Sequence, residues 1–131
     1  MYETYVTESQ AICLEDANRC FSELSQIAES TDETLKELYS DFVYACLRYA
    51  KIRSEWAFLT KEQKLETDSS RTSAHNSVIN THNILARYMT GIGRSTEWYT
   101  ILSYNEADKM SRKRIGDFAC YIALFLGLQA R

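Results

Sequence analysis

One carboxylate, Asp117, and one guanidinium, Arg53, occupy positions at which the sequence pattern predicts apolar residues. Asp117 aligns with Tyr121, Leu124 and Leu128 on one apolar face of the C-terminal stretch. A buried charge without a partner is costly, so we expect a cation to face Asp117. The candidates are Arg114, one helical turn earlier, and three arginines of other predicted helices: Arg53, Arg71 and Arg87.

Two interpretations of these charges lead to different functions. An interhelical Asp–Arg pair would fix the register of a helical bundle, and we favour this structural interpretation because buried ion pairs are seldom catalytic. Alternatively, arginines in excess over acids would form a pocket for a small anionic ligand. The candidate polar cluster for such a ligand comprises Arg53, Arg71, His75, His82, Asn83, Arg87, Arg114 and Asp117.

Both histidines lie on the apolar stripe of a predicted helix, one on each side of Val78. His75 and His82 are seven residues apart, which is about 10 Å along a helix axis. Both cannot easily reach one ion, and zinc needs about four ligands. The sequence contains neither Glu-x-x-His nor His-Glu-x-x-His. We expect hydrogen-bonded core histidines, with no metal and no other cofactor.

No pattern for nucleophilic catalysis stands out, and we assign no catalytic residue. Cys13, Cys20, Cys46 and Cys120 lie in apolar surroundings that would raise the pKa of a thiol, and they form no Cys-x-x-Cys pair. There is no Gly-x-Ser-x-Gly, P-loop or Gly-x-Gly-x-x-Gly motif. We expect reduced thiols of a cytoplasmic protein. The question of an enzymatic function stays open, because a sequence does not show which side chains of different helices come together.

The charges are unevenly distributed along the chain. Residues 1–70 carry a net charge of −7 and residues 71–131 a net charge of +4. Lys109 and the run Arg112-Lys-Arg114, together with Arg94, could contact phosphates. The overall charge of −3 and the pI of about 5.4 disfavour nucleic-acid binding through this 109–114 segment. A solvated face, or docking against the acidic half, is the simpler interpretation.

The composition predicts one globular all-α domain spanning residues 1–131. Apolar residues make up 45% of the chain and aromatic residues 12%, which is far from a disordered composition. The sequence has no proline and only four glycines. No stretch therefore has the composition of an interdomain linker, and long helices are favoured. The start, Met-Tyr-Glu-Thr-Tyr, lacks the pattern of a signal peptide, and we expect no membrane span.

The hydrophobic periodicity predicts a bundle of four main helices plus one or two short ones. The C-terminal stretch, Ile115 to Leu128, is apolar almost all round, so we place its helix at the centre of the bundle. Three other helices follow the 3.6-residue period over Thr4–Glu29, Thr31–Leu59 and Arg71–Met89. A short helical turn is expected over 60–67 and a short helix over 96–102. The polar segment from Ser103 to Met110 is either a turn or the exposed start of the last helix.

Helix ends are indicated by capping residues. Ser30 to Glu33 and Thr60 to Gln63 both have the spacing of a capping box. Residues 68–70, Asp-Ser-Ser, offer N-caps for a helix that starts at Arg71, and Gly91-Ile-Gly93 predicts its end.

Nine tyrosines exceed what the core of a helical chain needs. Tyrosine and tryptophan on helix surfaces are typical of protein interfaces. We assign Tyr39, Tyr49, Trp56 and Tyr121 to the core, and an exposed patch to a second group: Tyr44, Trp98, Tyr99 and Tyr104. The first functional hypothesis is therefore a non-catalytic protein-interaction or regulatory module with a protein partner, either itself as a homodimer or another chain. The anionic-ligand binder and the nucleic-acid binder are the alternatives.

Two stretches in the second half of the chain resemble a known family. They are Arg71-Thr-Ser-Ala-His75 with Asn83-Ile-Leu-Ala-Arg87-Tyr-Met, and Arg112-Lys-Arg-Ile-Gly-Asp-Phe-Ala-Cys-Tyr-Ile122. Together they resemble a family of small uncharacterised all-helical proteins from Gram-positive bacteria. The resemblance implies a bacterial cytoplasmic protein and no particular activity.

Overall fold

A computed structural model describes residues 14–94, 102 and 109–126 of the chain. These residues form four α-helices and one short 3₁₀-helix, with no strand among them. The elements are α2 (Leu14–Ser25), η1 (Gln26–Glu29), α3 (Glu33–Trp56), α4 (Lys61–Gly91) and α6 (Lys109–Phe125). The predicted all-α bundle of four main helices is confirmed.

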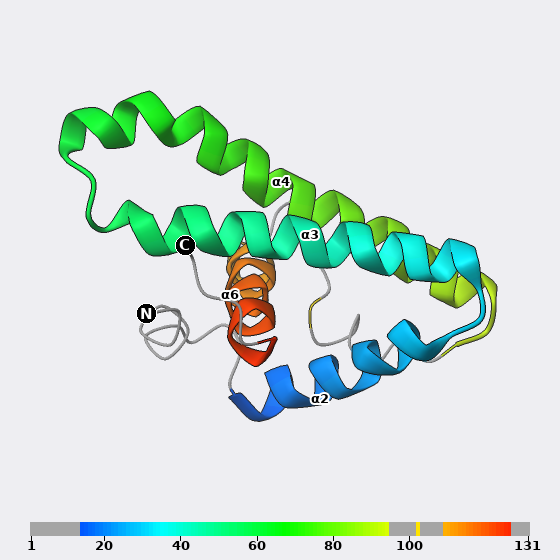
Figure 1. Cartoon of the computed structure of the whole chain (residues 1–131). Coiled ribbons are helices and arrows are strands. Elements are labelled where there is room, and N and C mark those ends of the chain that lie inside the picture. Colours follow the sequence, from blue (N-terminus) through cyan, green and yellow to red (C-terminus); the bar gives the residue numbers. More distant parts are fainter. Residues whose placement is uncertain (1–13, 95–101, 103–108, 127–131) are drawn as a thin grey trace.

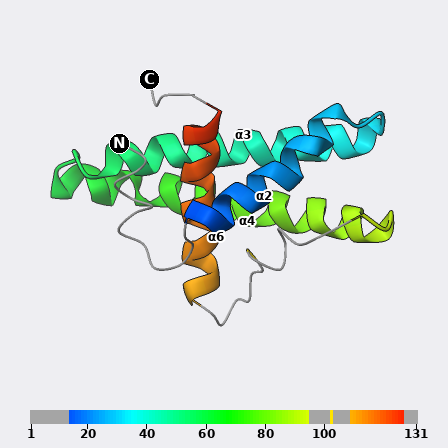
Figure 2. The same cartoon turned by 90° about the horizontal axis from the view of Figure 1, so that it is seen from below.

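The two longest helices, α3 and α4, form an antiparallel hairpin, and α6 crosses it (Figure 1). Seen from below, α6 runs crosswise to both hairpin helices, and α2 passes over its other side (Figure 2). Helix α6 contacts α3, α4 and α2, so the hairpin and α2 enclose it. No helix in the described residues is long and apolar enough to cross a membrane.

The C-terminal helix is the most deeply buried element, as the sequence predicts. Every residue from Ile115 to Ala123 is buried. Phe118 stacks on Phe42 of α3, with the ring centroids 6.4 Å apart. Burial of apolar area at about 25 cal/mol per Å² makes this helix a main source of stability. The central position of α6 is therefore confirmed.

Helix α3 starts two residues later than predicted, because Asp32 rather than Ser30 provides its N-cap. The Asp32 carboxylate accepts a hydrogen bond from the backbone N–H of Leu35 at 3.1 Å. Ser30 Oγ accepts one from the backbone N–H of Asp32 at 3.0 Å, so the predicted Ser30–Glu33 capping box is wrong. The Tyr88 hydroxyl of α4 donates to the second Asp32 oxygen at 2.6 Å, which gives aspartate a tertiary partner that serine would lack.

Helix α4 is one continuous helix of 31 residues. The capping box at Thr60 and Gln63 is confirmed, with reciprocal hydrogen bonds of 2.9 and 3.1 Å. The predicted break and new N-cap at residues 68–70 are wrong. No proline or glycine interrupts this stretch, and two of its polar side chains form bonds within the helix. The Thr67 hydroxyl donates to the Gln63 carbonyl at 2.8 Å, and Asp68 accepts from Arg71 at 3.1 Å. Residues with only weak helix propensity therefore continue the helix.

The predicted stop after Met89 is confirmed. Helix α4 ends at Gly91, and Gly93 has a φ of +74°, in the left-handed region that glycine adopts without strain. The predicted short helix over 96–102 and the turn from Ser103 lie outside the described residues, except for Leu102, which is buried, and for Lys109 and Met110, which already belong to α6. The first predicted helix is described only from Leu14, and it ends in η1.

Candidate functional site

The buried Asp117 of α6 forms an ion pair with Arg53 of α3. Arg53 Nη1 lies 2.8 Å from Asp117 Oδ1, the Asp117 side chain is fully buried and that of Arg53 is only 18% exposed. Burial opposes the charge of Arg53, but Cys120, Tyr49 and Asp117 outweigh it and raise the pKa of the guanidinium. The predicted interhelical Asp–Arg pair is therefore confirmed, and it ties the central helix to the hairpin.

Tyr49, one turn before Arg53 on α3, occupies the space between the hairpin and α6. Gly116 allows this close approach, because a Cβ added to it would lie 3.3 Å from Tyr49 Cε2 and 3.4 Å from His75 Cδ2. The Tyr49 and His75 rings meet edge to face with centroids 5.1 Å apart. Burial is the largest cause that raises the pKa of Tyr49, so its hydroxyl stays protonated and can donate a hydrogen bond.

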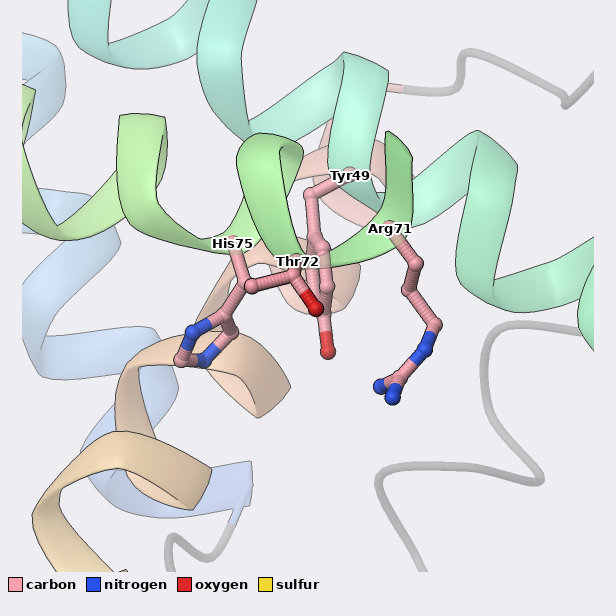
Figure 3. Close-up of a pocket in the computed structure, with 4 residues that line it drawn as sticks. All are labelled: Tyr49, Arg71, Thr72 and His75. Atoms are coloured by element: carbon pink, nitrogen blue, oxygen red, sulfur yellow. The ribbon is translucent and has the colours of Figure 1, made fainter. Parts of the chain in front are cut away.

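A cavity of about 160 Å³ opens beside this tyrosine. We call it the Arg71 cavity, and its lining residues are Tyr49, Arg71, Thr72 and His75. Figure 3 shows the four side chains leaving α3 and α4 toward the same side, with the Tyr49 hydroxyl between the Arg71 guanidinium and the His75 ring. The cavity thus combines one cation, two hydroxyls and an imidazole, all of which can hydrogen-bond a ligand.

Arg71 is the cationic group of the cavity, and its position is fixed by neighbours. Its guanidinium carbon lies 4.6 Å from the centroid of the Trp56 ring, in a cation–π contact. One terminal nitrogen pairs with Asp68 at 3.1 Å on the exposed surface of α4. The Arg71 Nε is buried and has no hydrogen-bond partner among the described residues. The surface of this atom is closed by the protein itself, so a ligand in the cavity does not reach it.

The structure divides the predicted polar cluster. Arg53, Arg71, His75 and Asp117 lie around Tyr49, at the crossing of α3, α4 and α6. Arg87 is exposed and lies 16 residues after Arg71, about 24 Å along α4. Arg114 is half-buried near the start of α6 and does not line the cavity.

The remaining two members of the predicted cluster, His82 and Asn83, contact each other. His82 Nδ1 lies 3.0 Å from Asn83 Oδ1, and the His82 ring packs near Phe42 in the core, with centroids 6.0 Å apart. Burial lowers the pKa of His82 to about 4, so the ring is neutral at physiological pH. The prediction that His82 is a hydrogen-bonded core histidine is confirmed.

The described cysteines have the properties of structural thiols. Cys20, Cys46 and Cys120 are buried. Burial raises the pKa of Cys120 to about 11 and that of Cys46 well above its ordinary value, so neither supplies a thiolate at neutral pH. Cys13 lies outside the described residues. Within the described part of the chain, no three His, Cys, Asp or Glu side chains are grouped to hold a metal ion.

Sequence reasoning missed three contributors to this site. Tyr49 is a core residue, as the sequence predicts, but the sequence does not show that it also lines a cavity four residues before Arg53. Thr72 follows Arg71 directly, and Gly116 precedes Asp117 in a helix where glycine is unfavourable. The glycine was a usable signal, because a costly glycine inside a buried helix indicates close approach of a neighbour.

Comparisons with known proteins place the chain in no family: no family model, curated protein or solved structure matches it. The resemblance to small helical proteins of Gram-positive bacteria stays a prediction.

Proposed function

We propose that this protein is a binding module for a small anion, and that the anion occupies the Arg71 cavity. The observation that carries the proposal is Arg71 itself, the permanent cation in the lining of the cavity, whose guanidinium is held against Trp56. The neighbouring Arg53 does not add free positive charge, because Asp117 balances it. Arg71 is therefore the lining residue whose charge attracts the anion.

The test measures ligand-dependent stability of the full chain against inorganic phosphate and a panel of small carboxylates. A ligand at 100 times its Kd raises the free energy of unfolding by about 2.7 kcal/mol. We expect at least one anion to stabilise the wild type and to lose its effect in Arg71→Met. Arg87→Met is the matched control, because it removes an exposed arginine of the same helix. If no anion stabilises the protein, or if both variants lose the effect equally, the proposal is wrong.

A second candidate function, protein interaction, is favoured by the closed end of the α3–α4 hairpin. We call residues 57–65 the hairpin tip, and in both views it extends past α6 (Figures 1 and 2). Phe58 is 78% exposed and Leu65 75% exposed, which is unusual for large apolar side chains that lie close together in the chain. Such a surface fits the hypothesis of a protein partner, whether a second copy or another chain.

Native mass measured over a range of concentrations tests self-association through this tip. Phe58→Ser with Leu65→Ser should abolish any dimer. Ile84→Ser should not, because Ile84 is an exposed apolar residue (47%) 19 residues after Leu65, about 28 Å along α4. A monomer at all concentrations would remove the homodimer hypothesis.

Cytoplasmic location and a bacterial source remain part of the proposal. Buried thiols at Cys46 and Cys120 with raised pKa values support a reducing compartment. Nucleic-acid binding through residues 109–114 stays the least supported hypothesis, because the overall charge of −3 and the pI of about 5.4 disfavour it.

A further inference from the structure

We infer that the two neighbours of the Arg71 guanidinium act on anion binding in opposite directions: Trp56 positions Arg71 for the anion, and Asp68 competes with the anion for Arg71. The inference rests on the proposed function and names the residues that set the affinity of that site. Asp68 is an internal competitor, which keeps the affinity of the Arg71 cavity below the value that its lining alone would give.

The charge that attracts an anion is supplied by Arg71. In Figure 3 its guanidinium lies to one side of the Tyr49 hydroxyl. Burial is the largest cause that raises the pKa of Tyr49, and the charges of Arg53 and Arg71 act against it, so the field of Arg71 reaches the cavity lining. Arg53 is balanced by Asp117 at 2.8 Å. The affinity for an anion therefore depends on how much of the Arg71 charge is available.

Asp68 takes up part of this charge. Its Oδ1 atom lies 3.1 Å from the Nη2 atom of Arg71, one helical turn later on α4. A carboxylate at this position occupies a donor of the guanidinium, and it also repels any anion that approaches the same cation. An anion in the cavity must therefore displace Asp68 or bind against its field.

The position of Arg71 depends more on Trp56 than on Asp68. The side chains of the ion pair are both exposed, Arg71 by 38% and Asp68 by 56%, and exposed pairs hold their partners only weakly. The Trp56 ring is half-buried, and its centroid lies 4.6 Å from the guanidinium carbon. An aromatic ring attracts a guanidinium without carrying a formal charge, so it does not neutralise the cation. Loss of Asp68 therefore frees charge, whereas loss of Trp56 frees the side chain to move.

Calorimetric titration of the full chain with inorganic phosphate and with benzoate tests the competition. Asp68→Asn removes the charge and keeps the shape, and we expect it to tighten anion binding roughly three- to tenfold. Glu66→Gln is the matched control, because it removes an exposed acid of the same helix that points about 200° away around the axis. The control should change the affinity by less than about twofold.

The competition must act through Arg71. In an Arg71→Met background, Asp68→Asn should not restore anion binding, because the cation for which the two anions compete is absent. A gain in affinity that persists without Arg71 would show a general effect of net charge, and it would overturn the competition.

The positioning role of Trp56 predicts the opposite sign. Trp56→Leu should weaken anion binding roughly two- to fivefold, because Arg71 loses the ring that holds it. Trp56→Phe keeps an aromatic ring at this position and should recover affinity toward the wild-type value. This recovery separates the positioning of Arg71 from a general loss of packing, and circular dichroism checks that each variant is folded.

The outcomes separate this inference from the proposed function. Weaker binding in Asp68→Asn would show that Asp68 positions Arg71, and unchanged binding would show that it does not compete. Unchanged or tighter binding in Trp56→Leu would overturn the role of Trp56. Each of these results leaves the anion-binding function standing. Absence of phosphate and benzoate binding in both the wild type and Asp68→Asn would overturn the inference and the proposed function together.

Discussion

The centre of α6 and the hairpin tip contain similar apolar residues in opposite environments. Phe118 and Ile122 of α6 are fully buried between the hairpin and α2, whereas Phe58 and Leu65 at the tip are among the most exposed large side chains described. A buried carboxylate with an arginine partner is found only at the first of these two regions. Similar apolar residues are therefore buried or exposed according to whether other helices pack against them. The same packing of crossed helices bounds the Arg71 cavity.

The largest effect should follow from breaking the ion pair at the crossing. Asp117→Ala leaves the mostly buried Arg53 guanidinium without its counter-ion, so we expect the free energy of unfolding to fall by about 3–5 kcal/mol. Urea denaturation measures this. The double variant Arg53→Met with Asp117→Leu, which replaces the pair with apolar groups, should recover at least half of the loss. A single-variant loss below about 1 kcal/mol would show that the pair is solvated.

Truncation in the core of α6 should come next. Phe118→Ala and Ile122→Ala each remove a fully buried side chain, and the cavity left behind should lower the free energy of unfolding by roughly 2–5 kcal/mol. Chemical denaturation measures the loss. If both variants lose less than about 1 kcal/mol, α6 is not the central helix.

Protonation of His82 should weaken the same core at acidic pH. The native pKa of about 4 lies below the ordinary value of 6.5, so the unfolded chain takes up a proton first as the pH falls. The free energy of unfolding is therefore unaffected above pH 6.5. It falls progressively between pH 6.5 and pH 4, by up to about 3 kcal/mol. Denaturation at several pH values should show this slope in the wild type and a flatter one in His82→Gln. Identical slopes would mean that His82 does not resist protonation.

The smallest effect is expected at the hairpin tip. Phe58→Ala and Leu65→Ala remove side chains that contact mainly solvent, so the free energy of unfolding of the monomer should change by less than about 0.5 kcal/mol. Denaturation at low protein concentration measures this. A loss above about 1 kcal/mol that grows with protein concentration would show that a second copy covers the tip.

Local pattern was sufficient to predict most of the helical framework. The all-α class, the burial of α6, the capping box at Thr60 and the stop after Met89 all follow from the 3.6-residue period and from residues that satisfy helix ends. The prediction failed at residues 68–70. Asp-Ser-Ser there has the composition of an N-cap, but the three residues are exposed and continue α4 without a break.

The sequence by itself determined that Asp117 needs a cation, because a carboxylate on an apolar helical face is too costly to bury alone. The sequence did not determine which arginine forms the ion pair with Asp117. Four arginines were equivalent candidates along the chain, and only the crossing of α6 under the hairpin brought Arg53 to 2.8 Å from Asp117 while it left Arg87 in solvent. Periodicity is a property of one helix, whereas a cavity is bounded by several. The meeting of Tyr49, Arg71, Thr72 and His75 was therefore decided by the tertiary structure alone.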